Sequence, residues 1–224
     1  MNIQQIPTIV WLPILVLLIA LLFAFGRWLS RRPYRAMDRA IQWARSRGCE
    51  IKEVKGFEWS VRHPNENWTM SFNKTSINSG SRISGFYNWS KPLDVPSGDI
   101  LLIFPVALES LESMFFDNAL MNLGLNGATL KETKTRLTPM PTGDREFDHQ
   151  WRVMGSHSGL ASIVGPEMRT TLHTYLFKFK RGIQFAVYKG ECKVFLLGNL
   201  LKPHELNDLD ELGKRWSAML SQIA

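Results

Sequence analysis

The first thirty residues carry one long apolar run. Residues 6–25 are apolar except for Pro7, Thr8 and Pro13, and residues 1–26 contain no charged side chain. A helix of this length measures about 30 Å, which matches the hydrocarbon core of a bilayer. The alternative, a cleaved signal peptide, begins with basic residues and has a shorter apolar run. The pattern therefore predicts an N-terminal transmembrane helix over residues 1–30.

Beyond residue 49, apolar and polar positions alternate in short stretches, which is typical of half-buried strands. Strands are expected at 57–62, 68–73, 83–89, 100–104, 147–153, 183–188 and 192–197. Helical periodicity or a leading proline predicts helices over 34–47 and 108–123 and after Pro166 and Pro203. Because the strands occur in hairpins rather than in strand–helix–strand units, the expected fold class is α+β, with a mostly antiparallel sheet and packed helices.

The expected organisation has three parts: a transmembrane anchor (1–30), a basic juxtamembrane helix (31–48) and a soluble α+β domain (49–224). Residues 125–145 are polar and contain Pro139, Pro141 and Gly143. They form a candidate boundary within the domain, with room for a strand near 131–137.

The net charge of +7 is concentrated next to the apolar run. Residues 27–47 hold seven Arg and one acid, whereas the chain from Gly48 onward is nearly neutral. This distribution favours contact with a membrane surface over binding of nucleic acid. The residues predicted to contact the membrane surface are Arg27, Arg31, Arg32, Arg35 and Arg39.

The same arginines predict an orientation, because basic residues favour the cytoplasmic side of a membrane. The expected location is the cell inner membrane, with a single pass, the N-terminus outside and the domain in the cytoplasm. Acceptor patterns for N-glycosylation at Asn67, Asn73 and Asn88 argue against this orientation. We interpret them as coincidental, since two lie within expected strands.

The sequence indicates no catalytic, cofactor-binding or metal-binding residue. His149 lies between Phe147 and Trp151 on the apolar side of an expected strand, which is typical of a core histidine. Cys49 and Cys192 are far apart and lack the spacing of a zinc site. Residues 155–159 have His157, not Ser, at the centre of a Gly-flanked segment, so they are interpreted as a loop rather than a nucleophile elbow.

The segments 147–153, 166–168 and 183–223 resemble an uncharacterised family, a domain of unknown function found in bacterial single-pass membrane-anchored proteins. The resemblance covers about the last 80 residues. It implies a fold and a compartment but no active residue.

These observations favour a membrane-anchored protein that binds a protein partner, as an assembly or accessory subunit, and that also contacts the lipid bilayer. Two alternatives remain: a regulatory module that senses anionic lipid through the arginines, and an enzyme whose site the sequence does not reveal.

Overall fold

The computed structural model describes residues 8–78, 82–93, 98–106, 116–117, 119–157, 162–179 and 182–222. The helices are α1 (Thr8–Ser46), α3 (Gly127–Arg136), α4 (Arg145–Gln150), α5 (Pro166–Lys178) and α6 (Pro203–Ser221). The strands are β1 (Glu50–Lys55), β2 (Glu58–His63), β3 (Trp68–Asn78), β4 (Arg82–Pro92), β5 (Ile100–Pro105), β6 (Thr138–Pro139), β7 (Trp151–Gly155), β8 (Ile183–Tyr188) and β9 (Glu191–Asn199).

All nine of these strands form one sheet, in the order β1-β2-β3-β4-β9-β8-β5-β7-β6. Every neighbouring pair is antiparallel. Strands close in sequence form hairpins, whereas the pairing of β4 with β9 joins the two halves of the chain. The expected α+β fold with an antiparallel sheet is therefore confirmed.

One face of the sheet carries the main core. The inward side chains of β2, β3 and β4 are largely aromatic, and Trp59, Trp68 and Trp89 are almost fully buried. Helix α6 covers them with an apolar stripe at helical spacing, from Leu206 to Trp216. The opposite face of the sheet has a smaller cluster, in which residues such as Leu120 and Leu123 pack on β5, β8 and β9.

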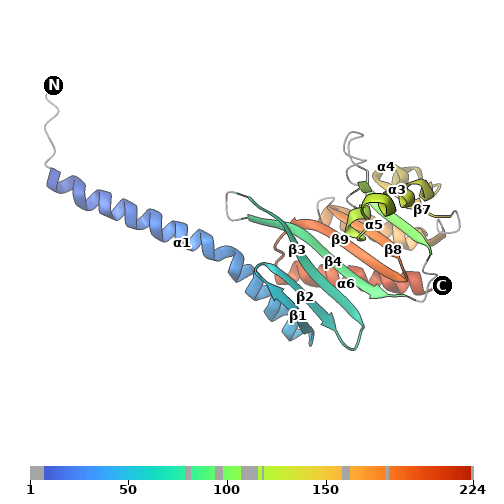
Figure 1. Cartoon of the computed structure of the whole chain (residues 1–224), viewed down its shortest axis with the longest axis horizontal. Helices are drawn as coiled ribbons and strands as arrows, with labels where there is room; N and C mark the ends of the chain where they lie inside the picture. Colours follow the sequence, from blue (N-terminus) through green and yellow to red (C-terminus); the bar gives the residue numbers. More distant parts are fainter. Residues whose placement is uncertain are drawn as a thin grey trace, which may run out of the picture.

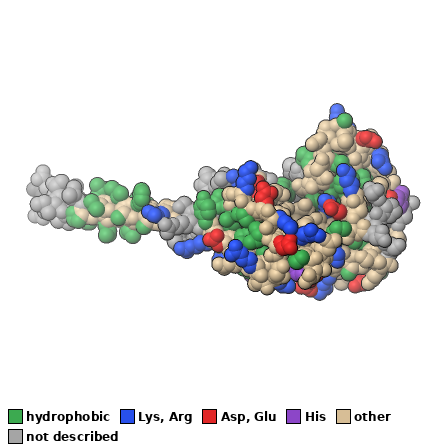
Figure 2. Space-filling model, turned by 60° about the horizontal axis from the view of Figure 1, so that its bottom comes forward, with side chains coloured by type: hydrophobic (Ala, Val, Ile, Leu, Met, Phe, Trp, Pro, Cys, Tyr) green, Lys and Arg blue, Asp and Glu red, His purple; other side chains and the backbone are tan. Residues whose placement is uncertain are grey.

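Among the described side chains, those at the C-terminal end of α1 join this helix to the body. Ala40, Trp43 and Ala44 are buried there, and both Trp43 Nε1 and the Arg47 guanidinium donate hydrogen bonds to Asn207 Oδ1, at 2.6 and 2.8 Å. The rest of α1 projects away from the sheet (Figure 1). Figure 2 shows hydrophobic side chains around this projecting part, whereas basic and acidic side chains intermingle on the visible face of the body.

The predicted transmembrane anchor is wrong for the part of the chain that the structure describes. Within those residues, no helix is both long and apolar enough to cross a membrane. The predicted single-pass topology and inner-membrane location with a cytoplasmic domain are corrected with it. Residues 1–7 of the predicted anchor lie outside the described part.

Three local predictions also need correction. The helix expected over 34–47 is the end of α1 rather than a separate element, and residues 131–136 are helical in α3, not a strand. The expected strand 147–153 begins only at Trp151, because Asp144 Oδ1 accepts hydrogen bonds from the backbone N–H groups of Glu146 and Phe147 and so starts α4. His149 therefore lies on a helix and is exposed, not in the core.

The sequence also gave no signal for β1, whose side chains are nearly all exposed. Periodic burial is the signal that reveals a strand, and this edge strand has little. The helix expected over 108–123 is present in its described part, since residues 119–122 are helical, whereas residues 107–115 and 118 lie outside the described part.

A close contact between α6 and β4 yields a stability prediction. A Cβ atom at Gly213 would overlap the Trp89 ring, whereas a Cβ at Gly26 of α1 would meet no atom within 4 Å. We expect Gly213→Ala to lower the free energy of unfolding by about 1–3 kcal/mol through overpacking, with the better helix propensity of Ala offsetting only part of the loss. Gly26→Ala is the matched control and should not destabilise the protein. Urea denaturation measures both, and equal effects would contradict the packing argument.

Candidate functional site

A charged network ties α6 to the turn between β2 and β3. The Lys214 ammonium lies 2.6 Å from Glu66 Oε2 and 3.0 Å from Asp210 Oδ2, and 5.8 Å from the centre of the Trp68 ring. Trp68 Nε1 donates to Glu66 Oε2 at 3.0 Å, and Trp89 Nε1 donates to Asp210 Oδ1 at 3.3 Å. The ammonium group thus contacts two carboxylates and one indole, and a second indole, that of Trp89, donates to one of those carboxylates.

The electrostatics of this network favour the charged forms of Glu66 and Lys214. The hydrogen bond from Lys214 keeps the pKa of Glu66 below its usual value. Burial alone would lower the pKa of Lys214, but hydrogen bonds to Glu66 and Asp210 outweigh it and raise that pKa. Asp210 is only 2% exposed, so its charge depends on Lys214 for compensation.

The thiol next to this network is not activated. Burial, followed by the nearby Asp210 carboxylate, raises the pKa of Cys49 to about 11. Burial likewise raises the pKa of Cys192 to about 11. Both thiols therefore stay protonated at neutral pH, in the state that is a weak nucleophile. The ion pairs of Lys214 instead hold α6 to the turn between β2 and β3, so we conclude that this charged network stabilises the fold.

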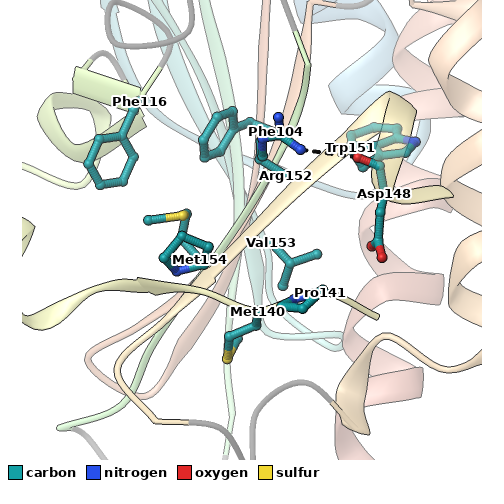
Figure 3. Close-up of a pocket in the computed structure, with 10 residues that line it drawn as sticks. Phe104, Phe116, Met140, Pro141, Asp148, Trp151, Arg152, Val153 and Met154 are labelled. Atoms are coloured by element: carbon teal, nitrogen blue, oxygen red, sulfur yellow. Dashed lines mark hydrogen bonds between the residues drawn. The ribbon is translucent and has the colours of Figure 1, made fainter. Parts of the chain in front are cut away.

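A cleft of about 540 Å³ lies at the other end of the sheet, beside β6 and β7. Its wall is mainly apolar. It comes from the end of β5, from Phe116, from the β6 region, from the end of α4 and from β7 (Figure 3). The lining residues are Phe104, Phe116, Pro139, Met140, Pro141, Asp148, Trp151, Arg152, Val153 and Met154. Volume and lining fall within the range that small-molecule sites show.

The two charged residues of the cleft are positioned by local hydrogen bonds. Asp148 Oδ1 accepts from the backbone N–H and the hydroxyl of Thr142, at 3.0 and 2.9 Å. The Arg152 guanidinium donates to the backbone carbonyl of Asp148 at 3.1 Å, as the dashed line in Figure 3 marks. Both side chains are half-buried; Arg152 lies beside its strand partner Phe104, whereas Asp148 lies on the side of the cleft away from Phe116 (Figure 3).

A smaller hollow of about 270 Å³ lies between α4 and α5. The Arg169 guanidinium bonds Asp144 Oδ2 there at 3.0 Å, and His173 Nδ1 lies 3.1 Å from Gln150 Oε1. The backbone N–H of Phe147, together with Arg169, lowers the pKa of Asp144. Asp144 and Arg169 thus hold α4 against α5.

The predicted membrane-surface residues lie on α1. Positions 27, 31, 35 and 39 are four residues apart in one continuous helix, so they follow one side of it. Arg27, Arg35 and Arg39 are exposed, whereas the side chains of Arg31 and Arg32 lie outside the described part. Contact of these arginines with a membrane surface stays a prediction.

Sequence reasoning missed the cleft, because its lining comes from segments far apart in the chain. The local signal was Pro139-Met140-Pro141, since prolines two apart at the end of a helix favour an irregular sheet edge. We instead interpreted that region as a candidate domain boundary. That boundary stays a prediction.

Comparison with known proteins gives one structural similarity. No protein-family model matches the sequence, and no curated protein matches it significantly. The structure is similar to the crystal structure of the mycobacterial trehalose monomycolate transport factor A, with a TM-score of 0.46 and 10% sequence identity. The match covers 84% of this chain and 93% of that chain. The resemblance of the C-terminal segments to a domain of unknown function stays a prediction.

The network around Lys214 predicts an asymmetric response to mutation. Lys214→Met leaves the Asp210 carboxylate buried without its cation, which typically costs about 3–5 kcal/mol of stability. Adding Asp210→Asn to Lys214→Met should recover part of that loss, because the amide is uncharged. Urea denaturation of the two single variants and the double variant measures the coupling. Additive losses would show that the two residues do not act as a pair.

The same network predicts a pH dependence. Because the folded pKa of Glu66 lies below its unfolded value, Glu66 contributes stability above its ordinary pKa, and this contribution is lost as the pH falls through the folded pKa. Lys214→Met should weaken this acid dependence between about pH 5 and pH 3. Melting temperatures over that range measure it, with Lys189→Met, on an exposed turn, as the control. An unchanged acid slope in Lys214→Met would contradict the assignment.

Proposed function

We propose that the protein is an accessory or assembly subunit that works while bound to another protein, with the projecting part of α1 as its docking element. The observation that carries this proposal is the exposure of α1. From Ile14 to Phe25, the large apolar side chains are 49–74% exposed. An apolar surface of this extent normally belongs to an interface.

The chemistry of α1 favours helices as its neighbours. A helix that is apolar on all sides is normally buried among several others. Ile19, Leu22, Phe23 and Gly26 follow helical spacing and, with Arg27, line an open groove on the surface of α1 at the glycine. Such a groove can receive side chains of a crossing helix, as ridges of one helix fill grooves of another.

The cleft supports binding rather than catalysis. Its two charged side chains are held by neighbouring backbone and hydroxyl groups, and the rest of its lining is apolar. The folded body therefore serves as a rigid base, and its connection to α1 through Trp43, Arg47 and Asn207 transmits the position of the docked helix.

Charge placed on α1 tests this function. Leu22→Asp puts a carboxylate in the apolar surface and should remove the protein from its complex in the native host, measured as a fall in apparent mass on native sedimentation. Met121→Asp is the matched control, because Met121 is an exposed apolar residue of the body. Both variants should melt like the unmodified protein.

Three outcomes would overturn the proposal. The first is an unchanged complex in Leu22→Asp. The second is a complex that contains only copies of this chain. The third is flotation of the purified chain with lipid vesicles, without any protein partner in the host fraction.

A second candidate function, recognition of an anionic lipid surface, is favoured by the arginines along one side of α1. Replacing Arg27, Arg35 and Arg39 by Gln should reduce binding to phosphatidylserine vesicles by about 3 kcal/mol, or on the order of 100-fold, at low salt. The control replaces Arg62, Arg136 and Arg145, which are exposed outside α1. The difference should shrink at high salt, because exposed charges are screened. Equal losses in the two triple variants, or no salt dependence, would exclude this function.

A further inference from the structure

The cleft beside β6 and β7 combines surfaces that normally lie in separate cores. Phe104, Phe116 and Met154 belong to the cluster on one face of the sheet, whereas Met140, Trp151 and Val153 belong to the cluster on the other. The cleft thus lies where the sheet ends and both clusters reach its edge. Its depth is apolar because each wall is the side of a packed core.

The sheet ends there at β6, its last strand, which is only two residues long. Pro139 has no N–H, and Pro141 has none either, so the wall that follows β6 offers few backbone donors. The N–H of Met140 is already used, since it donates to the carbonyl of Val153 at 2.9 Å. A molecule in this part of the cleft is therefore held by apolar contact rather than by hydrogen bonds.

The apolar part of the cleft suits a ligand with a flexible hydrocarbon portion. Phe104 and Phe116 lie with ring centres 5.9 Å apart and planes at 32°, so that they form an aromatic wall. Met140 and Met154 add unbranched, polarisable side chains that adapt to the shape of a ligand. In Figure 3, Phe116 and Met154 lie on one side of the cleft and Asp148 on the other.

The two charged residues that line the cleft are one acid and one base. Asp148 and Arg152 are joined through the Asp148 carbonyl, and their side-chain charges are of opposite sign. A charged head group would be attracted by one of them and repelled by the other. An uncharged head that both donates and accepts hydrogen bonds, such as a hydroxyl, fits both.

We propose that this cleft is a binding site for an uncharged amphiphile, with an alkyl or aryl body against Phe104, Phe116 and Met154 and a hydroxyl head towards Asp148 and Arg152. The site is independent of the docking role of α1. Loss of either one would leave the other intact.

The test uses the full chain, with the methyl groups of its methionines labelled with ¹³C. The probe that is added to it is 1-decanol. Titration should shift the methyl signals of Met140 and Met154 in a saturable manner. The signals of Met70, which is buried under α6, and of Met121, which is exposed on the body, should stay in place. This pattern separates the cleft from nonspecific contact with the apolar surface of α1.

Two variants make the assignment specific. Met154→Trp fills the cleft and should abolish the shift of Met140, whereas the matched Met121→Trp should bind decanol like the unmodified chain. Leu22→Asp on α1 should also leave the shift unchanged. Near-ultraviolet circular dichroism verifies that Met154→Trp is folded. If Met154→Trp does not fold, Val153→Phe, which also narrows the cleft, takes its place.

Head-group chemistry is tested with decanoate and decyltrimethylammonium. Both should bind about tenfold or more weakly than decanol, since each brings a charge that one wall group opposes. The proposal is overturned if decanol moves no cleft methyl group, if Met154→Trp or its substitute binds normally, or if either charged probe binds as tightly as decanol.

Discussion

The packing of α6 across β4 and β9 is the contact on which the rest of the fold depends. The two strands come from opposite halves of the chain, and their pairing leaves Trp89 facing α6. Gly213 lets the helix approach the indole ring closely, which brings Asp210 within hydrogen-bond distance of Trp89 Nε1. The close approach of the α6 backbone, the packing of the Trp89 ring and the hydrogen bond to Asp210 therefore depend on one another.

The contact between α6 and the sheet includes a buried carboxylate, that of Asp210. This carboxylate determines how α6 is positioned on the sheet. Asp210 is buried, so the Lys214 ammonium must lie where it can compensate, and this position also meets Glu66 in the turn before β3. An apolar stripe alone allows a helix to slide or rotate over an aromatic surface. A buried carboxylate with one matching cation permits far fewer arrangements. The hairpin β2–β3, helix α6 and the end of α1 are thereby fixed relative to one another.

The two surfaces proposed for binding lie outside this rigid centre. The cleft occupies the end of the sheet where β6 stops after two residues, and the projecting part of α1 extends beyond the last contact with α6. Both are apolar surfaces that the other described residues leave uncovered. The described body thus positions one helix and one cleft, which suits a protein that acts through its partners.

The sequence by itself determined the elements whose burial is periodic. Leu206, Leu209, Leu212 and Trp216 predicted α6, and the alternation of Trp68, Met70 and Phe72 predicted β3, because spacing alone decides which side chains share a face. It also determined the α+β class and the hairpin between the strands expected at 183–188 and 192–197, whose turn residues Lys189 and Gly190 have positive φ. Local alternation failed at His149, where the hydrogen bonds of one capping residue, Asp144, turned an apparent strand into a helix.

Only the tertiary structure decided which strands are neighbours and what the edges look like. Periodicity fixes the inward face of β4 but not its partner β9, because partner choice depends on how much surface the whole chain buries. The compensation of Asp210 by Lys214 and Glu66, and the meeting of Phe104, Phe116 and Met154 in one cleft, depend on the same long-range pairing. The apolar run of the first helix shows the same division: composition determined that it is apolar, whereas the structure placed it in one continuous helix with the arginines and with the segment that packs on α6.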